Sequence, residues 1–239
     1  MLKKANPLSK DKEDFLEIFC PPRMVPIAKS KGLTATLSMD LLTGWNFLDP
    51  RVRAYVRSLV RARKPTLIHV SPPCTMYSKV LHSNKNRMDP TKLAVRRAEG
   101  QALLEFAMEM CTLQAKSKRF FSFEHPDGAS SWAEAKVRDV EALRGVMKAR
   151  FDQCTFGLVS KEEKLPIQKR TVIMTNLKPL HDQFSGKFCT CTVPHQVCQG
   201  SEGGVRRCAW AAKYPVPMAT AIVKSMRVDH VVDAPHRSS

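Results

Sequence analysis

The sequence predicts an α/β domain built on a doubly wound, mostly parallel sheet. Short apolar runs that suit buried strands alternate along the chain with segments that carry apolar residues at helical spacing. Several of these runs stop abruptly at proline, which offers no backbone N–H and so ends sheet pairing. A chain of 239 residues, 43% of them hydrophobic, suffices for one sizeable domain with a small appendage.

The start of the chain predicts a β-α-β unit. Residues 15–19 alternate apolar and polar side chains and end at Cys20-Pro21-Pro22-Arg23, which indicates a strand and its turn. Residues 24–31 predict a short helix closed by a glycine, and residues 33–39 predict a second strand that ends at Asp40.

Strands and helices continue to alternate after this unit. Residues 51–64 predict a helix with apolar and basic faces, and residues 67–70 predict a buried strand that ends in a proline pair before Cys74. The same reasoning predicts further helices at 91–116, 137–150 and 218–226 and further strands at 119–126, 151–156 and 171–176.

These elements divide the chain into five parts. We expect a frayed, basic N-terminus at 1–13, the core at 14–176, a small Cys- and His-bearing recognition segment at 177–213, a closing helix packed on the core at 214–228, and a disordered tail at 229–239.

The net charge of +17 and the pI near 9.8 favour a polyanionic partner, and nucleic acid is the leading class. No apolar run is long enough for a membrane span, and residues 1–12 do not resemble a signal peptide, so we expect an intracellular protein, nuclear or cytoplasmic, without a membrane partner. A basic helical stripe and a basic loop supply candidate phosphate contacts, although such a stripe is also typical of a solvated helix face. These candidates are Arg53, Arg57, Arg61, Ser78, Lys79, Lys85 and Arg87.

Four chemistry-bearing side chains lie at strand ends. Cys74 follows one buried strand, Glu124 lies near the end of another, and Gln168 and Arg170 precede a third. Such a set suits attack on a heteroaromatic base: a thiolate adds to the ring, a carboxyl group binds its nitrogen edge, and a guanidinium stabilises developing charge. The competing interpretation is a packed cysteine beside a rigid turn for Cys74 and a simple ion pair with a basic neighbour for Glu124.

The order of these motifs resembles that of the cytosine-5 methyltransferases. The motifs are Ser71-Pro72-Pro73-Cys74, Phe123-Glu124-His125-Pro126 and Pro166-Ile167-Gln168-Lys169-Arg170. The resemblance implies a Rossmann-like methyltransferase fold in which Cys74 attacks carbon 6 of a flipped cytosine, Glu124 binds the base edge, and Arg170 contacts the base or sugar. It also implies methylation of carbon 5, and DNA is expected as the substrate ahead of RNA.

The resemblance further implies S-adenosylmethionine as cofactor. It would be held by Glu17, Phe19, Asp40 and Pro72, although an Asp after a strand also commonly caps the next helix. The family's glycine-rich Phe-x-Gly-x-Gly turn is replaced by Phe19-Cys20-Pro21-Pro22-Arg23. The variant motifs also look like divergent methyltransferase-like domains of retroelement polyproteins in algae and dinoflagellates.

Two other functions remain open from the sequence. A domain that has lost the glycine turn can be a catalytically silent nucleic-acid-binding module. An exocyclic-amine methyltransferase also carries Ser-Pro-Pro, followed by an aromatic residue, but Cys74 occupies that place here.

A separate cluster of soft ligands predicts a structural zinc site. Cys189, Cys191, His195 and Cys198 lie close together in sequence, and Cys208 is a possible substitute for one of them. The alternative is a reduced loop with incidental thiols.

Overall fold

The computed structural model describes residues 12–78, 81 and 88–227, and its centre is a six-stranded sheet. In spatial order the strands are β2 (Ser38–Met39), β1 (Phe15–Ile18), β3 (Leu67–Val70), β4 (Phe120–Pro126), β7 (Arg170–Thr175) and β5 (Met147–Asp152). The first four run parallel, whereas β7 is antiparallel to both of its neighbours. The prediction of a mostly parallel α/β sheet is confirmed.

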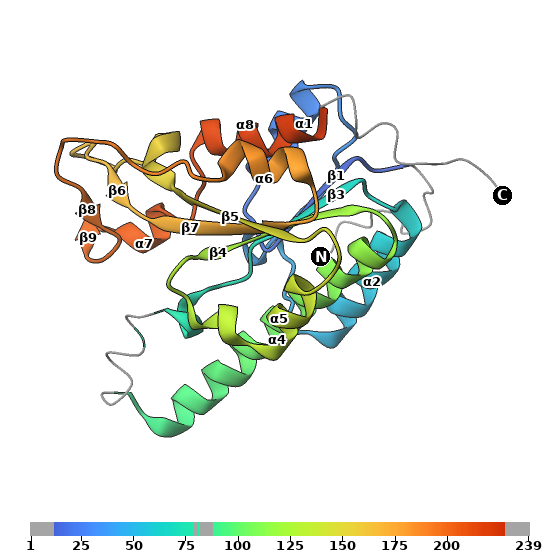
Figure 1. The fold of residues 1–239 in the computed structure, drawn as a ribbon. Helices are drawn as coiled ribbons and strands as arrows, with labels where there is room; N and C mark the ends of the chain where they lie inside the picture. The colour runs from blue at the N-terminus through green and yellow to red at the C-terminus, as the bar shows by residue number, and fades with distance from the viewer. Residues whose placement is uncertain (1–11, 79–80, 82–87, 228–239) are drawn as a thin grey trace.

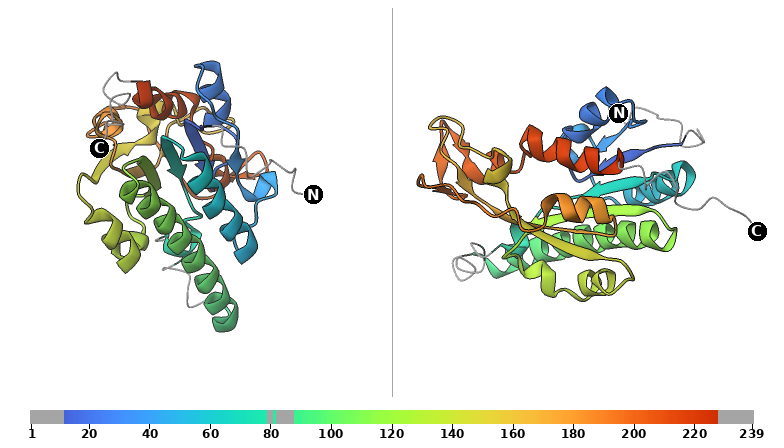
Figure 2. Two further views of the ribbon diagram at one scale, coloured as in Figure 1. Left: turned by 90° about the vertical axis from the view of Figure 1, so that its right-hand side faces the viewer. Right: turned by 45° about the horizontal axis from the view of Figure 1, so that its top comes forward.

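Helices cover both faces of this sheet (Figures 1 and 2). One face carries α1 (Met24–Ser30), α6 (Lys178–Phe184) and α8 (Val216–Lys224), and the other carries α2 (Pro50–Arg63), α4 (Pro90–Lys116) and α5 (Ala135–Glu141). Successive residues of one strand enter opposite layers: Phe15 packs in the α1/α8 cluster and Leu16 in the α2/α4 cluster. Burial on both faces explains why apolar residues predominate in β1, β3 and β4.

The strand order places a switch point between β1 and β3. From β1 the chain passes outward to β2, and it then returns to β3 on the other side of β1. In doubly wound sheets, ligands bind at the carboxyl ends of the strands that flank such a point. The segments that leave β1 and β3 there begin at Phe19 and Ser71.

The edge of the sheet differs from the sequence prediction. The helix expected at 137–150 ends at Glu141, and the strand expected at 151–156 begins earlier, at Met147. Gly145, with φ of +81°, lies in the turn between them. The composition of residues 147–150 suits a helix, but Ala149 and Phe151 alternate inward along an edge strand, so tertiary burial overrides propensity. Likewise, only Ser38–Met39 of the expected strand 33–39 pairs with β1.

A small lobe lies at the carboxyl edge, beside the start of β7 (Figure 1). Its elements are β6 (Ile167–Gln168), β8 (Gln196–Val197), β9 (Ser201–Glu202), β10 (Val205–Arg206) and α7 (Arg207–Trp210). The expected segment 177–213 starts too early, because α6 belongs to the core: Leu180 and Phe184 are fully buried against β5 and β7. Within the expected closing segment 214–228, α8 packs on α1 of the core.

A buried ion pair fixes the start of the described chain. Glu13 is 1% exposed, and its carboxylate accepts a hydrogen bond from Arg63 at 2.8 Å and another from the Thr36 hydroxyl at 2.7 Å. The expectation of a frayed segment through residue 13 is therefore wrong at Glu13. Residues 1–11 and the predicted tail at 229–239 lie outside the described residues.

We predict that Glu13→Ala lowers the free energy of unfolding by about 3–5 kcal/mol, because it leaves the Arg63 guanidinium buried without its counter-charge. Urea denaturation at neutral pH measures this loss. Asp182→Ala is the matched control, since it breaks the solvent-exposed Lys178–Asp182 pair, and its midpoint should be unchanged. Equal effects of the two substitutions would contradict the assignment.

Candidate functional site

A chain of hydrogen bonds crosses the middle of the sheet and ends at Glu124. Oε2 of Glu124 accepts from the hydroxyl of Ser71 at 2.7 Å and from that of Tyr214 at 2.9 Å. Because Tyr214 gives its only proton to the carboxylate, its oxygen accepts from Nε2 of His69 at 3.0 Å. Nδ1 of His69 then accepts from the Ser122 hydroxyl at 3.0 Å. Strands β3 and β4, the loop after β3 and the segment before α8 are thereby joined through one carboxylate.

Glu124 is held ionised although it is buried. Burial raises its pKa, but the positive charge of Lys169, the Ser71 hydrogen bond and the Tyr214 hydrogen bond together bring the pKa below its ordinary value. Nζ of Lys169 lies 3.9 Å from Oε1. Burial also lowers the pKa of His69 to about 4, so this ring is neutral at pH 7.

One oxygen of this carboxylate has no hydrogen-bond partner. Oε1 of Glu124 is buried and accepts no hydrogen bond among the described residues. Buried polar atoms are nearly always satisfied, and an orphaned one marks a place where a ligand or a water completes the site. Tyr214 and Lys169, which shape this site, were missed by the sequence prediction.

The loop after β3 holds Cys74 at the same edge. Pro72 is buried, and its carbonyl accepts from Nε2 of His125 at 3.1 Å. The next turn packs so closely on α4 that a Cβ on Gly100 would lie 2.9 Å from Cγ of Met76. A glycine at that position of the helix therefore permits the close approach of the Cys74 loop.

The thiol of Cys74 is protonated at rest. Burial raises its pKa, the charge of Glu124 raises it further, and Lys169 lowers it. Cys74 thus lies within the electrostatic reach of both charged groups of the site. Its side chain is partly exposed, as a group that meets a substrate must be.

In the Gln168-Lys169-Arg170 motif, Lys169 faces Glu124, where Arg170 was expected. Arg170 does not reach Glu124; its guanidinium forms a two-pronged pair with Asp152 at 2.9 and 3.1 Å and lies over the ring of Phe188. Gln168 is exposed. Lys169 points the opposite way, toward Glu124, and donates to the Ala211 carbonyl at 3.0 Å. The period-2 alternation of an extended segment was the signal for Lys169.

The residues expected to hold a cofactor separate into two groups. Glu17 is fully buried, and its two oxygens accept from the N–H groups of Met24 and Val25 at the start of α1 at 2.8 and 3.0 Å. Phe19 has a φ of 61° and packs its ring 4.3 Å from that of Phe47, centroid to centroid. The first turn is thus filled by the protein's own side chains.

Asp40 lies in a more open setting. One carboxylate oxygen accepts from Leu42 N–H at 2.9 Å, so Asp40 caps the short helix that follows β2, as the competing interpretation held. The side chain is partly exposed, and Leu41 and Leu42 beside it are 70% and 78% exposed. A carboxylate next to exposed apolar side chains suits a nucleoside, which offers hydroxyls and an apolar ring face.

The candidate phosphate contacts are only partly available. Arg57 pairs with Glu109 on α4 at 2.8 Å, and Arg53 donates to the Phe47 carbonyl at 2.6 Å. Both line the same groove beside α2, α4 and α5 as Arg61. Ser78 bonds within its own turn, where its hydroxyl donates to a backbone carbonyl. Lys79, Lys85 and Arg87 lie outside the described residues.

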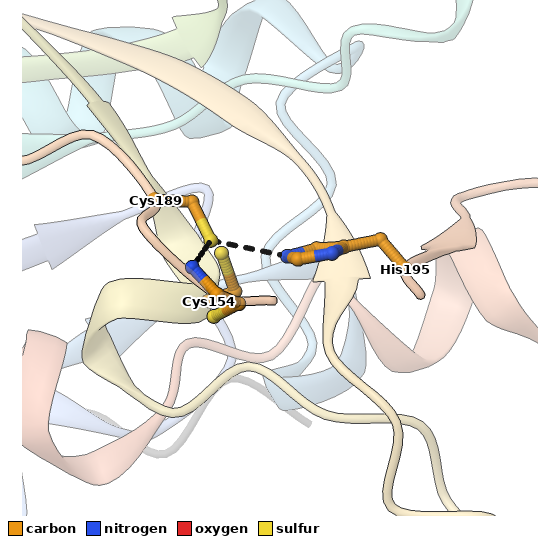
Figure 3. A group of neighbouring side chains, drawn as sticks. Cys154, Cys189 and His195 are labelled. Carbon is orange, nitrogen blue, oxygen red and sulfur yellow. Dashed lines mark hydrogen bonds between the residues drawn. The ribbon is translucent and has the colours of Figure 1, made fainter. Parts of the chain in front are cut away.

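Three of the four predicted zinc ligands, Cys189, Cys191 and His195, lie together, but the fourth member of the group is Cys154 and not Cys198. Ligand atoms of Cys154, Cys189, Cys191 and His195 lie within 4.8 Å of one another. Figure 3 shows Cys154, Cys189 and His195 of this group. Cys198 lies instead against the apolar cluster of the lobe, and Cys208 is exposed outside the group. The sequence prediction missed Cys154 because it follows β5, far away along the chain.

The sequence was compared with known proteins as well. No protein-family model matches this chain, and no curated protein matches it. Within the described part of the chain, no helix combines the length and apolar character needed to cross a bilayer.

Proposed function

We propose that this protein binds nucleic acid and methylates carbon 5 of a flipped cytosine, with Cys74 as the covalent nucleophile and Glu124 on the base edge. The observation that carries the proposal is the buried, ionised Glu124, whose Oε1 accepts no hydrogen bond among the described residues, in electrostatic reach of the partly exposed Cys74. A hydrogen-bond acceptor next to a thiol suits a base that presents an amine and an electrophilic carbon. The net charge of +17 supports a polyanionic substrate.

The chain's own residues would act as follows. Oε1 of Glu124 accepts a hydrogen bond from the exocyclic amine of the base, and Lys169 keeps the carboxylate charged. Sulfur of Cys74 bonds to carbon 6 while the thiol gives its proton to solvent, and the electron pair of the carbon 5–carbon 6 double bond moves to carbon 5, where it would form the bond to the methyl group. When the carbon 5 proton then leaves to solvent, the electron pair of its C–H bond re-forms the double bond, and the sulfur leaves carbon 6 as thiolate.

The cofactor that the resemblance implies fits this edge of the sheet at its nucleoside end. Asp40 would hold ribose hydroxyls, and Leu41 and Leu42 would contact the adenine face. When bound, S-adenosylmethionine supplies the methyl group. The filled turn at Phe19 leaves Asp40 and its neighbours as the main holding residues.

A second function is favoured by one observation at the same turn. Pro21 and Pro22 offer no N–H, and both oxygens of Glu17 are used within the protein. These features suit a catalytically silent nucleic-acid-binding module that retains the fold. The two functions differ in whether the protein binds S-adenosylmethionine: the methyltransferase must bind it, and the silent module need not.

We predict micromolar binding of S-adenosylmethionine and its demethylated product in calorimetric titrations. Asp40→Asn should weaken this binding by about 10- to 150-fold, the cost of losing a hydrogen bond to a charged group, while it keeps the helix cap. Absence of binding in folded protein, together with salt-sensitive binding of nucleic acid, would select the silent module.

We predict a covalent adduct between Cys74 and 5-fluorocytosine in mixed-sequence DNA when S-adenosylmethionine is present, because fluorine cannot leave as the proton does. Mass spectrometry of tryptic peptides locates the bond, and an RNA pool tests the preference for DNA. Cys74→Ala should form no adduct, whereas Cys111→Ala, which removes a fully buried thiol of α4, should form it as the wild type does. An adduct that survives in Cys74→Ala would refute the role of Cys74.

We predict that adduct formation accelerates about tenfold from pH 7 to 8, because the raised pKa of Cys74 keeps the thiol mostly protonated in this range. Lys169→Met should shift this profile to higher pH, since Lys169 lowers the Cys74 pKa. Arg170→Met should not move the profile, because Arg170 pairs with Asp152 instead. A shift caused by Arg170→Met alone would restore the role expected from the motif.

A further inference from the structure

The lobe at the carboxyl edge has short strands and a small apolar core. Its described strands are two residues long each, and its apolar cluster is built on Leu158, Ile167 and Ala211. A unit of this size rarely folds on apolar burial alone, and metal ions or disulfides commonly compensate. All eight cysteines are free, so disulfides do not serve this purpose.

We propose that Cys154, Cys189, Cys191 and His195 bind one structural Zn²⁺ that fastens the lobe to the edge strand β5. Three thiolates and one imidazole form an established tetrahedral zinc set, and four protein ligands leave no open position for catalysis. Their ligand atoms lie within 4.8 Å of one another, close enough for one ion to reach all four.

The imidazole is oriented as a ligand. Nδ1 of His195 donates to the backbone carbonyl of Val193 at 3.1 Å, which fixes the tautomer that leaves the lone pair of Nε2 free. Nε2 in turn faces the sulfur of Cys189 at 3.2 Å (Figure 3). A ring held by its other nitrogen in this way is typical of zinc-bound histidine.

The four ligands come from two separate parts of the chain. Cys154 lies in the turn directly after β5, whereas the other three follow α6. An ion shared between them closes a long loop, and such a clip removes much conformational entropy from the unfolded chain. Cys154 is therefore the ligand that joins the lobe to the sheet.

The same ion would also steady Arg170. Oδ2 of Asp152 accepts from the Cys189 N–H at 3.0 Å, and the carboxylate also binds the guanidinium of Arg170. Phe188, next to Cys189, lies under that guanidinium with its ring centroid at 5.0 Å. Loss of the ion would thus loosen both partners of Arg170 at once.

The first experiment uses the full chain purified under reducing conditions. Elemental analysis should find one zinc per chain, and X-ray absorption should show three sulfur ligands and one nitrogen. Alkylation of the zinc-loaded protein should spare Cys154 while it modifies Cys198, and chelation should expose Cys154. Absence of zinc, a disulfide among these thiols, or protection of Cys198 in place of Cys154 would overturn the proposal.

Matched variants test the ligand set independently of nucleic-acid chemistry. Cys154→Ser should lower zinc affinity by more than the 10- to 100-fold that loss of an outer-shell partner costs, whereas Cys198→Ser should leave it unchanged. If Cys154→Ser does not fold, the alkylation pattern of the wild type still decides between the two cysteines. The reverse result would restore the ligand set predicted from spacing.

Hydrogen exchange tests the structural role. Chelation should accelerate amide exchange in residues 187–213 and leave β3 and β4 unchanged. Unchanged exchange in the lobe would refute the fastening role even if zinc binds.

Discussion

The structure depends on keeping one carboxylate ionised in its interior. An isolated buried charge costs several kcal/mol or more, so Glu124 requires partners. Ser71 and Tyr214 supply hydrogen bonds, and Lys169 supplies the charge. These partners come from the loop after β3, the segment before β7 and the segment before α8. The charge therefore constrains where each of these segments lies, and it links the fold to the site.

This constraint accounts for the path of the last segment. Tyr214 is 90 residues away from Glu124 and 145 from His69 along the chain, yet its hydroxyl lies between them. Apolar packing of α8 on α1 brings the segment back to the sheet, and the hydroxyl then settles its register. The partly exposed Cys74 is thereby combined with a rigid polar interior, which is the arrangement that covalent attack on a bound base requires.

A second carboxylate, that of Asp152 at the end of β5, holds the lobe in a similar way. This carboxylate binds both the backbone of Cys189 and the guanidinium of Arg170, so the Cys/His group and the motif arginine share one anchor at the end of β5. The motif arginine thus has a structural partner, and the inward position belongs to Lys169. Two adjacent residues of one extended segment serve two different sites because their side chains alternate.

The sequence by itself determined the alternation of strands and helices, the ends of β3 and β4, and hence the placing of Cys74 and Glu124 at one edge. These features follow from local periodicity and from proline, which act within a few residues. The first part of the edge strand β5, residues 147–150, was predicted as helix because its composition suits a helix. Only the tertiary structure decided that Lys169, Tyr214 and Cys154 complete the two sites. The partner of a buried charge or of a metal-ligating group depends on which distant segments pack together in the folded chain. A local sequence pattern does not determine that packing.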